Sequence, residues 1–227
     1  MSTGSPRGGV QPPRRLTLET LGAGARHLAV SDPDLASVLD RLGEPPLWGR
    51  NPGFPTLVRI ILEQQVSLAA ARTLYLRLVR RLGGMTPEAV HAAGVGGLRD
   101  FGLTRQKAAY CHGLASRVLD GRLDLAAVAR GADDAGRRLL LGVPGLGPWS
   151  IDIYYLMALR RPDVWPQGDL ALAAALRDVK RLGAAPTRVQ QQALAAAWAP
   201  WRSVAARVLW AHYLDARGQY RPRSGIE

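Results

Sequence analysis

The sequence predicts an all-α protein with about ten to twelve helices, and three observations support this prediction. Apolar residues recur three or four positions apart along most of the chain, as at Leu74, Leu78 and Leu82, and no stretch alternates convincingly with period two. Capping residues precede many of these apolar segments, and glycine follows many of them. Of the 227 residues, 47% are hydrophobic, which is enough to bury a substantial core.

The bounds of the predicted helices follow from capping residues, prolines and glycines. Asp32-Pro33, for example, combines a capping aspartate with a proline favoured in the first turn, and Gly43 is a typical helix end. The first 15 residues contain Gly, Pro, Ser and Arg but no acidic residue, and we predict a disordered basic arm over 1–18. The predicted helices run from Ser31 to Gly43, Phe54 to Gln65, Ser67 to Gly83, Thr86 onward, Thr104 to Asp120, Asp133 to Leu141, Pro148 to Arg161, Asp169 to Arg181, Pro186 to Trp198 and Trp201 to Arg217.

The segment from Gly142 to Ser150 is the most informative motif in the chain. Its three glycines, at 142, 145 and 147, permit positive φ and the close approach of another molecule. Pro148 then begins a helix, whose N-terminus presents unpaired backbone N–H groups suited to a phosphate. We therefore expect a helical hairpin that grips a nucleic-acid backbone.

The charge of the chain favours a polyanionic partner. Thirty Lys and Arg against 18 Asp and Glu give a net charge of +12, and DNA or RNA is the first partner to consider. The other explanation is a GC-rich genome that uses arginine freely. No signal peptide and no apolar run of about 18 residues is present, so the expectation is a cytoplasmic protein that does not bind membranes.

Cysteine and histidine usage argues against metal chemistry. The single cysteine, Cys111, excludes an intrachain disulfide and a Cys-rich metal or iron–sulfur site. Cys111 follows a helical pattern of small residues, so we expect a core position. The four histidines are scattered without the spacing of zinc ligands.

Four ordered motifs together resemble the helix-hairpin-helix (HhH-GPD) DNA glycosylases, and within them the AlkA-like 3-methyladenine DNA glycosylase II branch. The resemblance covers roughly residues 30 to 215. The sequence has no room for the extra N-terminal α/β domain of some relatives, so it resembles a compact form of the family. The motifs are Ile61–Arg72, Gly102–Tyr110, the hairpin Gly142–Ser150 with the later Asp169, and Trp198–Ser203 running on to Trp210.

The family fold implies two helical lobes with a DNA cleft between them. One lobe would contain 19–52 together with 162–227, and the other would contain 53–161, with the helix-hairpin-helix at about 133–161. The implied partner is double-stranded DNA with damaged bases, bound by a monomer associated with a bacterial nucleoid. No cofactor is required by this resemblance, although the family often holds Na⁺ or K⁺ at the hairpin.

Asp169 is the catalytic residue that the resemblance implies. A carboxylate beside the anomeric carbon stabilises the positive charge that builds on the sugar and can orient or deprotonate water. The alternative is an ordinary helix N-cap, because aspartate is common before an apolar helix. Both can hold, since a capping aspartate is fixed in place.

Trp149 stands where the resembled lyases carry a Schiff-base lysine, and tryptophan has no amine. The enzyme is therefore expected to be monofunctional. Lys180 lies about three turns after Asp169 and Lys107 lies in another predicted helix, so both are poor substitutes for the Schiff-base lysine. Trp149 and Trp210 match pocket positions that would stack on a cationic base, although core packing is the alternative for each. Ile153 stands where an AlkA-like relative has tyrosine, which implies a roomier pocket. Asp152 is an unusual charge in an apolar helix, and it either faces the cleft or pairs with an arginine.

The remaining site residues concern DNA binding. Gln64 and Gln65 lie between two predicted helices, and Gln65 matches a leucine that fills the gap left by a flipped base; a simple turn is the alternative. Backbone N–H groups of Gly145, Leu146 and Gly147 would bind a phosphate, and carbonyls of Leu141, Val143 and Leu146 would hold the cation. Arg202 and Arg105 suit either phosphate contacts or ion pairs.

Three functions fit the sequence. The first is a monofunctional glycosylase that removes alkylated bases such as 3-methyladenine and 7-methylguanine and so initiates base-excision repair. The second keeps the fold but acts on deaminated, oxidised or etheno bases. The third is a non-catalytic DNA-binding module that uses the hairpin alone, which predicts salt-sensitive binding without base release.

Overall fold

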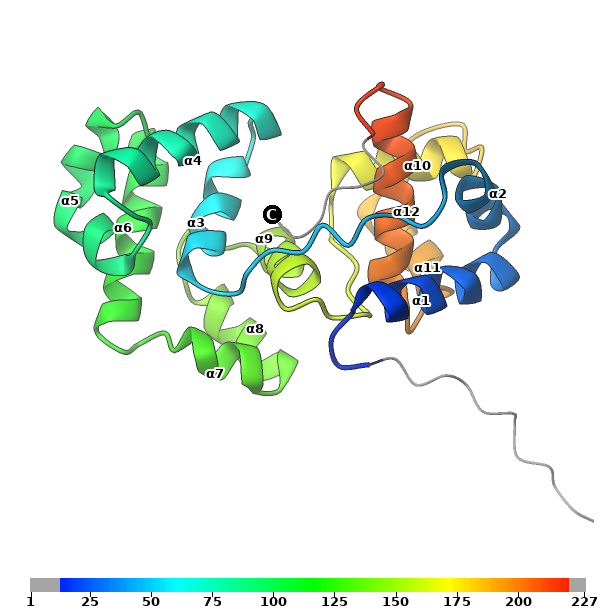
Figure 1. Ribbon diagram of the computed structural model, residues 1–227, viewed down its shortest axis with the longest axis horizontal. Coiled ribbons are helices and arrows are strands. Elements are labelled where there is room, and N and C mark those ends of the chain that lie inside the picture. Colours follow the sequence, from blue (N-terminus) through cyan, green and yellow to red (C-terminus); the bar gives the residue numbers. More distant parts are fainter. Residues whose placement is uncertain (1–12, 221–227) are drawn as a thin grey trace, which may run out of the picture. The chain divides into compact units, whose positions relative to one another are not determined.

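The computed structural model describes residues 13–220, and within them it contains twelve α-helices and no β-strand (Figure 1). The all-α prediction is confirmed. The helices are α1 (Leu18–Ser31), α2 (Pro33–Leu42), α3 (Phe54–Glu63), α4 (Leu68–Leu82), α5 (Pro87–Asp100), α6 (Arg105–Leu119), α7 (Leu125–Arg130), α8 (Asp133–Leu141), α9 (Pro148–Ile153), α10 (Leu170–Val179), α11 (Arg188–Ala196) and α12 (Arg202–Asp215), and α9 continues into the π-helical segment η1 (Tyr154–Ala158).

The chain divides into two compact units. Among the described residues, the first unit contains 13–47, 161–165 and 170–220, and the second contains 48–160 and 166–169. The short return at 166–169 places Asp169 in the second unit, although the helix that follows it belongs to the first.

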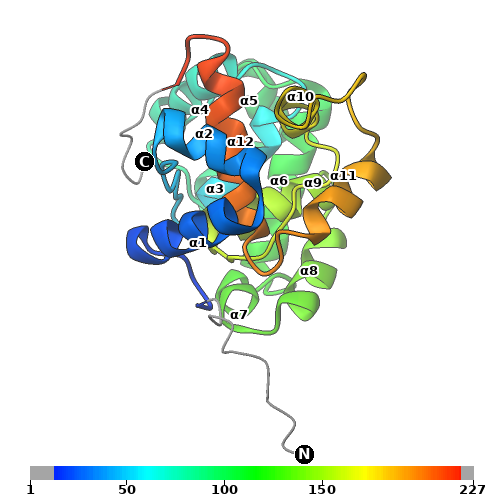
Figure 2. The same ribbon diagram turned by 90° about the vertical axis from the view of Figure 1, so that its right-hand side faces the viewer.

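The first unit packs α1, α2, α10 and α11 around α12, and Figure 2 shows α12 beside α2. Nine consecutive residues of α12, Ser203–Ala211, are buried, so this helix has no solvent-facing polar side over that length. Arg207 is completely buried there, and its guanidinium donates hydrogen bonds to the carbonyls of Leu47 and Ser203 at 2.8 and 2.9 Å. Those bonds offset part of the cost of burying a charge.

The second unit contains α3 to α9 and η1, with α3 near its centre. Helix α3 is buried at Leu57, Ile60 and Ile61 and packs on α4, α6, α9 and η1. Helices α5 and α6 form the most extensive pair, and α7 and α8 lie side by side (Figures 1 and 2). The capping predictions in this unit are confirmed, since Ser67 and Thr104 accept N-cap hydrogen bonds from Ala70 and Lys107.

Several predicted bounds need correction. The predicted arm over 1–18 extends too far, because Leu16 is fully buried and Thr17 forms a capping box at the start of α1; residues 1–12 lie outside the described part of the chain. Helices α1 and α7 were not predicted. The helix predicted over Pro148–Arg161 is α-helical only to Ile153 and then widens into η1. No helix in the described chain is long and apolar enough to cross a membrane.

Candidate functional site

The predicted hairpin joins α8 to α9 in the second unit. Its turn is closed by a hydrogen bond of 3.1 Å from the Leu146 N–H to the Val143 carbonyl. Gly145 has φ of +91°, and a Cβ built on it would lie 2.5 Å from the ring of Tyr110. Glycine is therefore required at 145 both for the backbone angle and for the packing of Tyr110 beneath the loop.

The side chain of Gln64 fastens this hairpin to the end of α3. Its Nε2 donates to the Gly145 carbonyl at 2.8 Å and to Ser150 Oγ at 2.9 Å. Both amide hydrogens are thus used inside the second unit, where they hold the hairpin loop against α3. The DNA-binding role of Gln64 stays a prediction.

Lys107 holds the same turn from α6. Its Nζ donates to the carbonyls of Leu62 and Gln64 at 2.7 and 2.8 Å, which are carbonyls that the end of α3 leaves without helical partners. Burial lowers the pKa of this ammonium from its ordinary value. Gln64 and Lys107, with these hydrogen bonds, are called the turn brace below.

Gln65 lies directly after the brace and has a different environment. Its side chain is exposed, and its backbone has φ of +58°, a left-handed conformation that is uncommon for a residue other than glycine. Strained backbone of this kind persists only where the surroundings impose it, and Lys107 binds the carbonyl immediately before it. The brace therefore fixes the direction in which Gln65 is presented.

Asp169 is held by Trp149. The indole Nε1 donates to Oδ2 of Asp169 at 3.0 Å, and the aspartate is only 8% exposed. The residue closes a turn in which its N–H donates to the Pro166 carbonyl at 3.4 Å, with Gly168 at φ of +75°. A positive φ at that third position is typical of a type II turn. Trp149 is thus partly committed to orienting a carboxylate.

Asp152 positions the backbone of that turn. Its Oδ1 accepts from Arg137 Nη1 at 2.6 Å, and its Oδ2 accepts from the Gln167 N–H at 3.2 Å. Asp152 is 3% exposed, so the sequence alternatives resolve in favour of pairing with an arginine. The same side chain reaches the residue two positions before Asp169, which sequence reasoning did not predict.

The π-helical segment that follows is anchored by two tyrosines. Tyr154 accepts a hydrogen bond from the Gly53 N–H at 3.0 Å, and Tyr155 donates to the Asp133 carbonyl at 3.0 Å. Arg137, the partner of Asp152, also lies 4.4 Å above the Tyr155 ring. These contacts fix α9 and η1 within the second unit.

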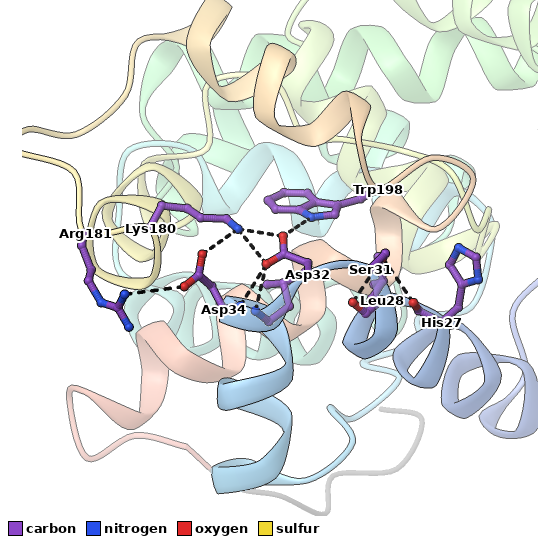
Figure 3. A network of polar contacts seen from close by, with 9 residues as sticks. His27, Leu28, Ser31, Asp32, Asp34, Lys180, Arg181 and Trp198 are labelled. Atoms are coloured by element: carbon purple, nitrogen blue, oxygen red, sulfur yellow. Dashed lines mark hydrogen bonds and ion pairs between the residues drawn. The ribbon is translucent and has the colours of Figure 1, made fainter.

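Lys180 is fully engaged in the first unit (Figure 3). Its Nζ binds both oxygens of Asp32 at 2.7 and 2.8 Å and Oδ2 of Asp34 at 2.9 Å. Asp32 also accepts from Trp198 Nε1 at 2.7 Å, and it caps α2 through the N–H groups of Asp34 and Leu35. This cluster ties the end of α10 to the start of α2.

The other predicted residues have the following surroundings. Ile153 is 3% exposed in the second unit, and Trp210 is 8% exposed in the first. Arg202 forms an ion pair with Asp163 at 2.6 Å, which decides between its two alternatives, whereas Arg105 is exposed at the start of α6. Cys111 is buried as predicted, and burial raises the pKa of its thiol to about 12, so it is unreactive at neutral pH.

Sequence reasoning did not predict several residues that support the hairpin and the end of α3. Ser150 and Tyr110 lie inside motifs that were recognised, but their contacts depend on α3, α6 and the hairpin meeting. Glu63 belongs to the same set, since Arg50 binds both its oxygens at 2.8 and 2.9 Å. The searched part of the chain, 13–220, contains no group of three or more His, Cys, Asp or Glu that could hold a metal ion.

Comparison with known families decides the relationship. Residues 58–202 match the model described as the HhH-GPD superfamily base excision DNA repair protein. The chain belongs to this superfamily. The matched HhH-GPD region contains the turn brace, the hairpin, Asp152 and Asp169, and it spans both units.

Individual relatives agree with this HhH-GPD assignment. A Mycobacterium tuberculosis protein with the name "Probable bifunctional transcriptional activator/DNA repair enzyme AlkA" is 33% identical over 92% of this chain and 46% of its own length. Escherichia coli DNA-3-methyladenine glycosylase 2 is 28% identical over 76% of this chain and 63% of its own length. The chain therefore spans less than two thirds of either relative.

A solved structure shows the same fold. The Schizosaccharomyces pombe 3-methyladenine DNA glycosylase Mag1, in complex with abasic DNA, superimposes with a TM-score of 0.77. The alignment covers 83% of this chain and 95% of Mag1 at 23% identity, which supports the architecture.

Proposed function

We propose that this protein is a monofunctional DNA glycosylase that hydrolyses the N-glycosidic bond of alkylated bases, of the 3-methyladenine and 7-methylguanine class, in duplex DNA. Membership of a base-excision repair superfamily supports this proposal. So do the names of the relatives from M. tuberculosis and E. coli. The observation that carries it is the buried carboxylate of Asp169, oriented by the Trp149 indole at 3.0 Å.

Asp169 supplies the catalytic charge in this proposal. As the bond between the base and the sugar lengthens, positive charge develops on the sugar, and a fixed carboxylate stabilises it. The bonding electrons leave with the base, and water adds its oxygen to the anomeric carbon after losing a proton to Asp169. An alkylated purine is already cationic, so its departure needs little help from a general acid.

The contacts of the two lysines support the part of the proposal that excludes lyase activity. A lyase of this kind needs a free amine that forms a Schiff base with the sugar. The sequence contains two lysines. Lys107 donates to two carbonyls, and Lys180 binds two aspartates. Trp149 occupies the position where the resembled lyases carry their lysine, and its indole nitrogen is bound to Asp169.

The base pocket and the DNA contacts complete the proposal. Trp149 would stack on the cationic base, with Ile153 of the same unit allowing a roomier pocket than tyrosine would. Gln65, exposed and fixed by the turn brace, would fill the gap left when the base is flipped out of the stack.

The hairpin would bind the phosphate backbone through the N–H groups of Gly145 and Gly147, since the N–H of Leu146, predicted for the same role, already donates to the Val143 carbonyl. The carbonyls of Leu141, Val143 and Leu146 are neutral oxygen donors, a type suited to Na⁺ or K⁺, and a cation held there would supply positive charge that favours phosphate binding. In this proposal the protein acts as a monomer on the DNA of a bacterial cytoplasm.

The test is base release from methylated duplex DNA. Wild-type protein is incubated with dimethyl sulfate-treated DNA, the freed bases are resolved by chromatography, and strands are analysed before and after alkali. We expect free 3-methyladenine or 7-methylguanine, with strand breaks only after alkali, and no covalent product on borohydride reduction. Asp169→Asn provides the inactive control.

Each other outcome is informative. Strand cleavage without alkali, or a borohydride-trapped complex, would contradict the monofunctional part. Release of uracil or an oxidised base but not an alkylated one would change the substrate class. Salt-sensitive binding without any base release would leave a DNA-binding module.

A further inference from the structure

All charged residues of helix α4 (Leu68–Leu82) are cationic. Its sequence contains four arginines and no lysine, histidine or acidic residue. All four arginines are exposed, whereas Ala71 and Leu78 are 1% exposed. The α4 basic face is defined here as Arg72, Arg77, Arg80 and Arg81.

The arginines of this face share one half of the helix. At about 100° per residue, the four fall within an arc of about 180°, and Ala71 and Leu78 fall in the opposite half. A helix that merely needs a solvated side usually mixes charges of both signs, which adds favourable pairs along its surface. Here nothing on α4 offsets the repulsion between neighbouring arginines.

The arginines also lack carboxylate partners. Within residues 13–220, none of the four forms an ion pair, whereas elsewhere Arg50, Arg137 and Arg202 each bind a buried or half-buried carboxylate. The chain therefore neutralises arginines in its interior and leaves those of α4 open to solvent. An array of this kind has the chemistry of a polyanion-binding surface.

A neighbouring turn extends the positive region. Arg77 packs on Gly102, where a built Cβ would lie 2.9 Å from its Nη1. Gly102 lies in the turn between α5 and α6, three residues from both Arg99 and Arg105. Asp100 is the single carboxylate of segment 99–105, so this turn adds net positive charge beside α4.

The position of α4 in the chain indicates what binds there. The helix begins directly after the turn that presents Gln65, and Ser67 is its N-cap. Arg72 and Arg81 are nine residues apart, or about 13 Å along the axis, which corresponds to about four phosphates of one DNA strand. The basic face thus leads away from the residue proposed to enter the duplex.

We propose that the α4 basic face binds the phosphate backbone of duplex DNA beside the lesion, as a second DNA-binding surface in addition to the hairpin. Guanidinium groups suit phosphates because they donate in pairs. Such contacts carry no sequence information, so this surface sets the affinity for undamaged DNA during the search. The inference rests on the proposed function in taking DNA as the ligand, but it requires no catalysis.

The test compares two triple variants with equal loss of charge. Arg77→Gln/Arg80→Gln/Arg81→Gln removes three of the four arginines of the basic face, and Arg122→Gln/Arg177→Gln/Arg188→Gln removes three exposed arginines elsewhere. Binding to an undamaged 30-base-pair duplex is measured by fluorescence anisotropy at several salt concentrations. Circular dichroism establishes that both variants are folded.

The expected result is specific to the first variant. Its plot of log affinity against log salt should lose about one unit of slope for each phosphate contact removed, or about three in all. Affinity at moderate salt should fall about tenfold or more. With damaged DNA, KM should rise while kcat at saturation stays unchanged. A matched salt slope in the two variants would overturn the proposal.

Failure of the proposal and failure of the proposed function give different results. A wild-type protein that binds DNA but releases no base would contradict the enzyme while leaving the α4 surface intact. Normal base release with equal binding by both variants would contradict the surface alone. Binding of the wild type to anionic lipid vesicles, lost in the first variant while DNA binding persists, would assign the face to a membrane and overturn the proposal.

Discussion

Two aspartates in this molecule look alike and do different things. Asp32 in the first unit and Asp169 in the second are each 8% exposed, and each directly precedes a helix. Each accepts a hydrogen bond from a tryptophan indole, from Trp198 at 2.7 Å and from Trp149 at 3.0 Å. Residue type, burial and local sequence therefore do not separate a structural carboxylate from a proposed catalytic one.

Asp32 has, in addition, a cationic partner and a capping role. Both oxygens of Asp32 are bound by the Lys180 ammonium, and its Oδ1 also caps α2. An ammonium neutralises the carboxylate that it binds, whereas an indole N–H orients a carboxylate and leaves its charge in place. The comparison teaches that burial and an indole partner do not by themselves indicate what an aspartate is for.

Apart from changes to the catalytic step, the substitution expected to have the largest effect is one at Lys180, which changes the free energy of unfolding. Lys180→Met should lower the free energy of unfolding by about 3 kcal/mol, because it leaves Asp32 buried without its cation. Urea denaturation followed by circular dichroism measures this loss. Arg181→Met is the matched control, since its side chain is 85% exposed and lies 4.0 Å from Asp34; equal effects of the two substitutions would contradict the assigned role.

The next effect concerns the positioning of Asp169. Asp152→Ala should lower the single-turnover rate of base release about tenfold, because the backbone at Gln167 loses its acceptor and the turn carrying Asp169 can shift. Asp152→Asn keeps an acceptor and should recover part of the rate. If the single-turnover rate of Asp152→Ala equalled that of the wild type and only its stability fell, the role of Asp152 would be structural alone.

The turn brace is expected to have a smaller effect on chemistry than on binding. Gln64→Leu leaves the Gly145 carbonyl and Ser150 hydroxyl without their donor and should cost about 1–2 kcal/mol of stability. KM for damaged DNA should rise while kcat changes little. The adjacent exposed residue gives the control, since Gln65→Leu should leave stability unchanged; the reverse order of stabilities would contradict the brace.

The smallest effect is a pH dependence that appears only at the extremes. Burial alone would raise the pKa of Asp32, but hydrogen bonds from Lys180 and Trp198 outweigh it and lower that pKa. The stabilisation is therefore present above about pH 4 and lost as pH falls through the lowered value.

At high pH, stability changes with pH in the opposite direction. Burial would lower the pKa of Lys180, but Asp32 and Asp34 raise it, so its contribution is present below about pH 10 and lost as pH rises through the raised value. Between these limits the stability difference between wild type and Lys180→Met should be flat in denaturation at several pH values. A marked change near pH 7 would contradict this assignment.

Local chemistry made much of the fold predictable. Ser67, Thr86 and Thr104 begin helices because their hydroxyls accept N-cap hydrogen bonds, and all three do so in the structure. The hairpin was predictable for the same reason, since Gly145 needs its positive φ locally. The sequence does not predict helix α1 because Gly22 and Gly24 weaken helix propensity. Tertiary packing requires the glycine at 24, since a Cβ there would lie 2.7 Å from the Trp201 ring.

The candidate site was predictable in its residues but not in their contacts. The motif resemblance indicated Asp169 and Trp149, yet the hydrogen bond between them joins residues 20 apart and depends on the turn at 166–169. Lys107 and Gln64 lie 43 apart and meet through tertiary packing. No local pattern could reveal that Asp152 holds the backbone at Gln167.

The most direct test of the difference between the two aspartates is one assay on two matched variants. Asp169→Asn and Asp32→Asn are compared in single-turnover release of 7-methylguanine from duplex DNA, at a temperature where circular dichroism shows both to be folded. We predict that Asp169→Asn loses at least about 100-fold in rate with unchanged unfolding, and that Asp32→Asn unfolds more readily but releases base at the wild-type rate. Equal rates for Asp169→Asn and the wild type would contradict the account.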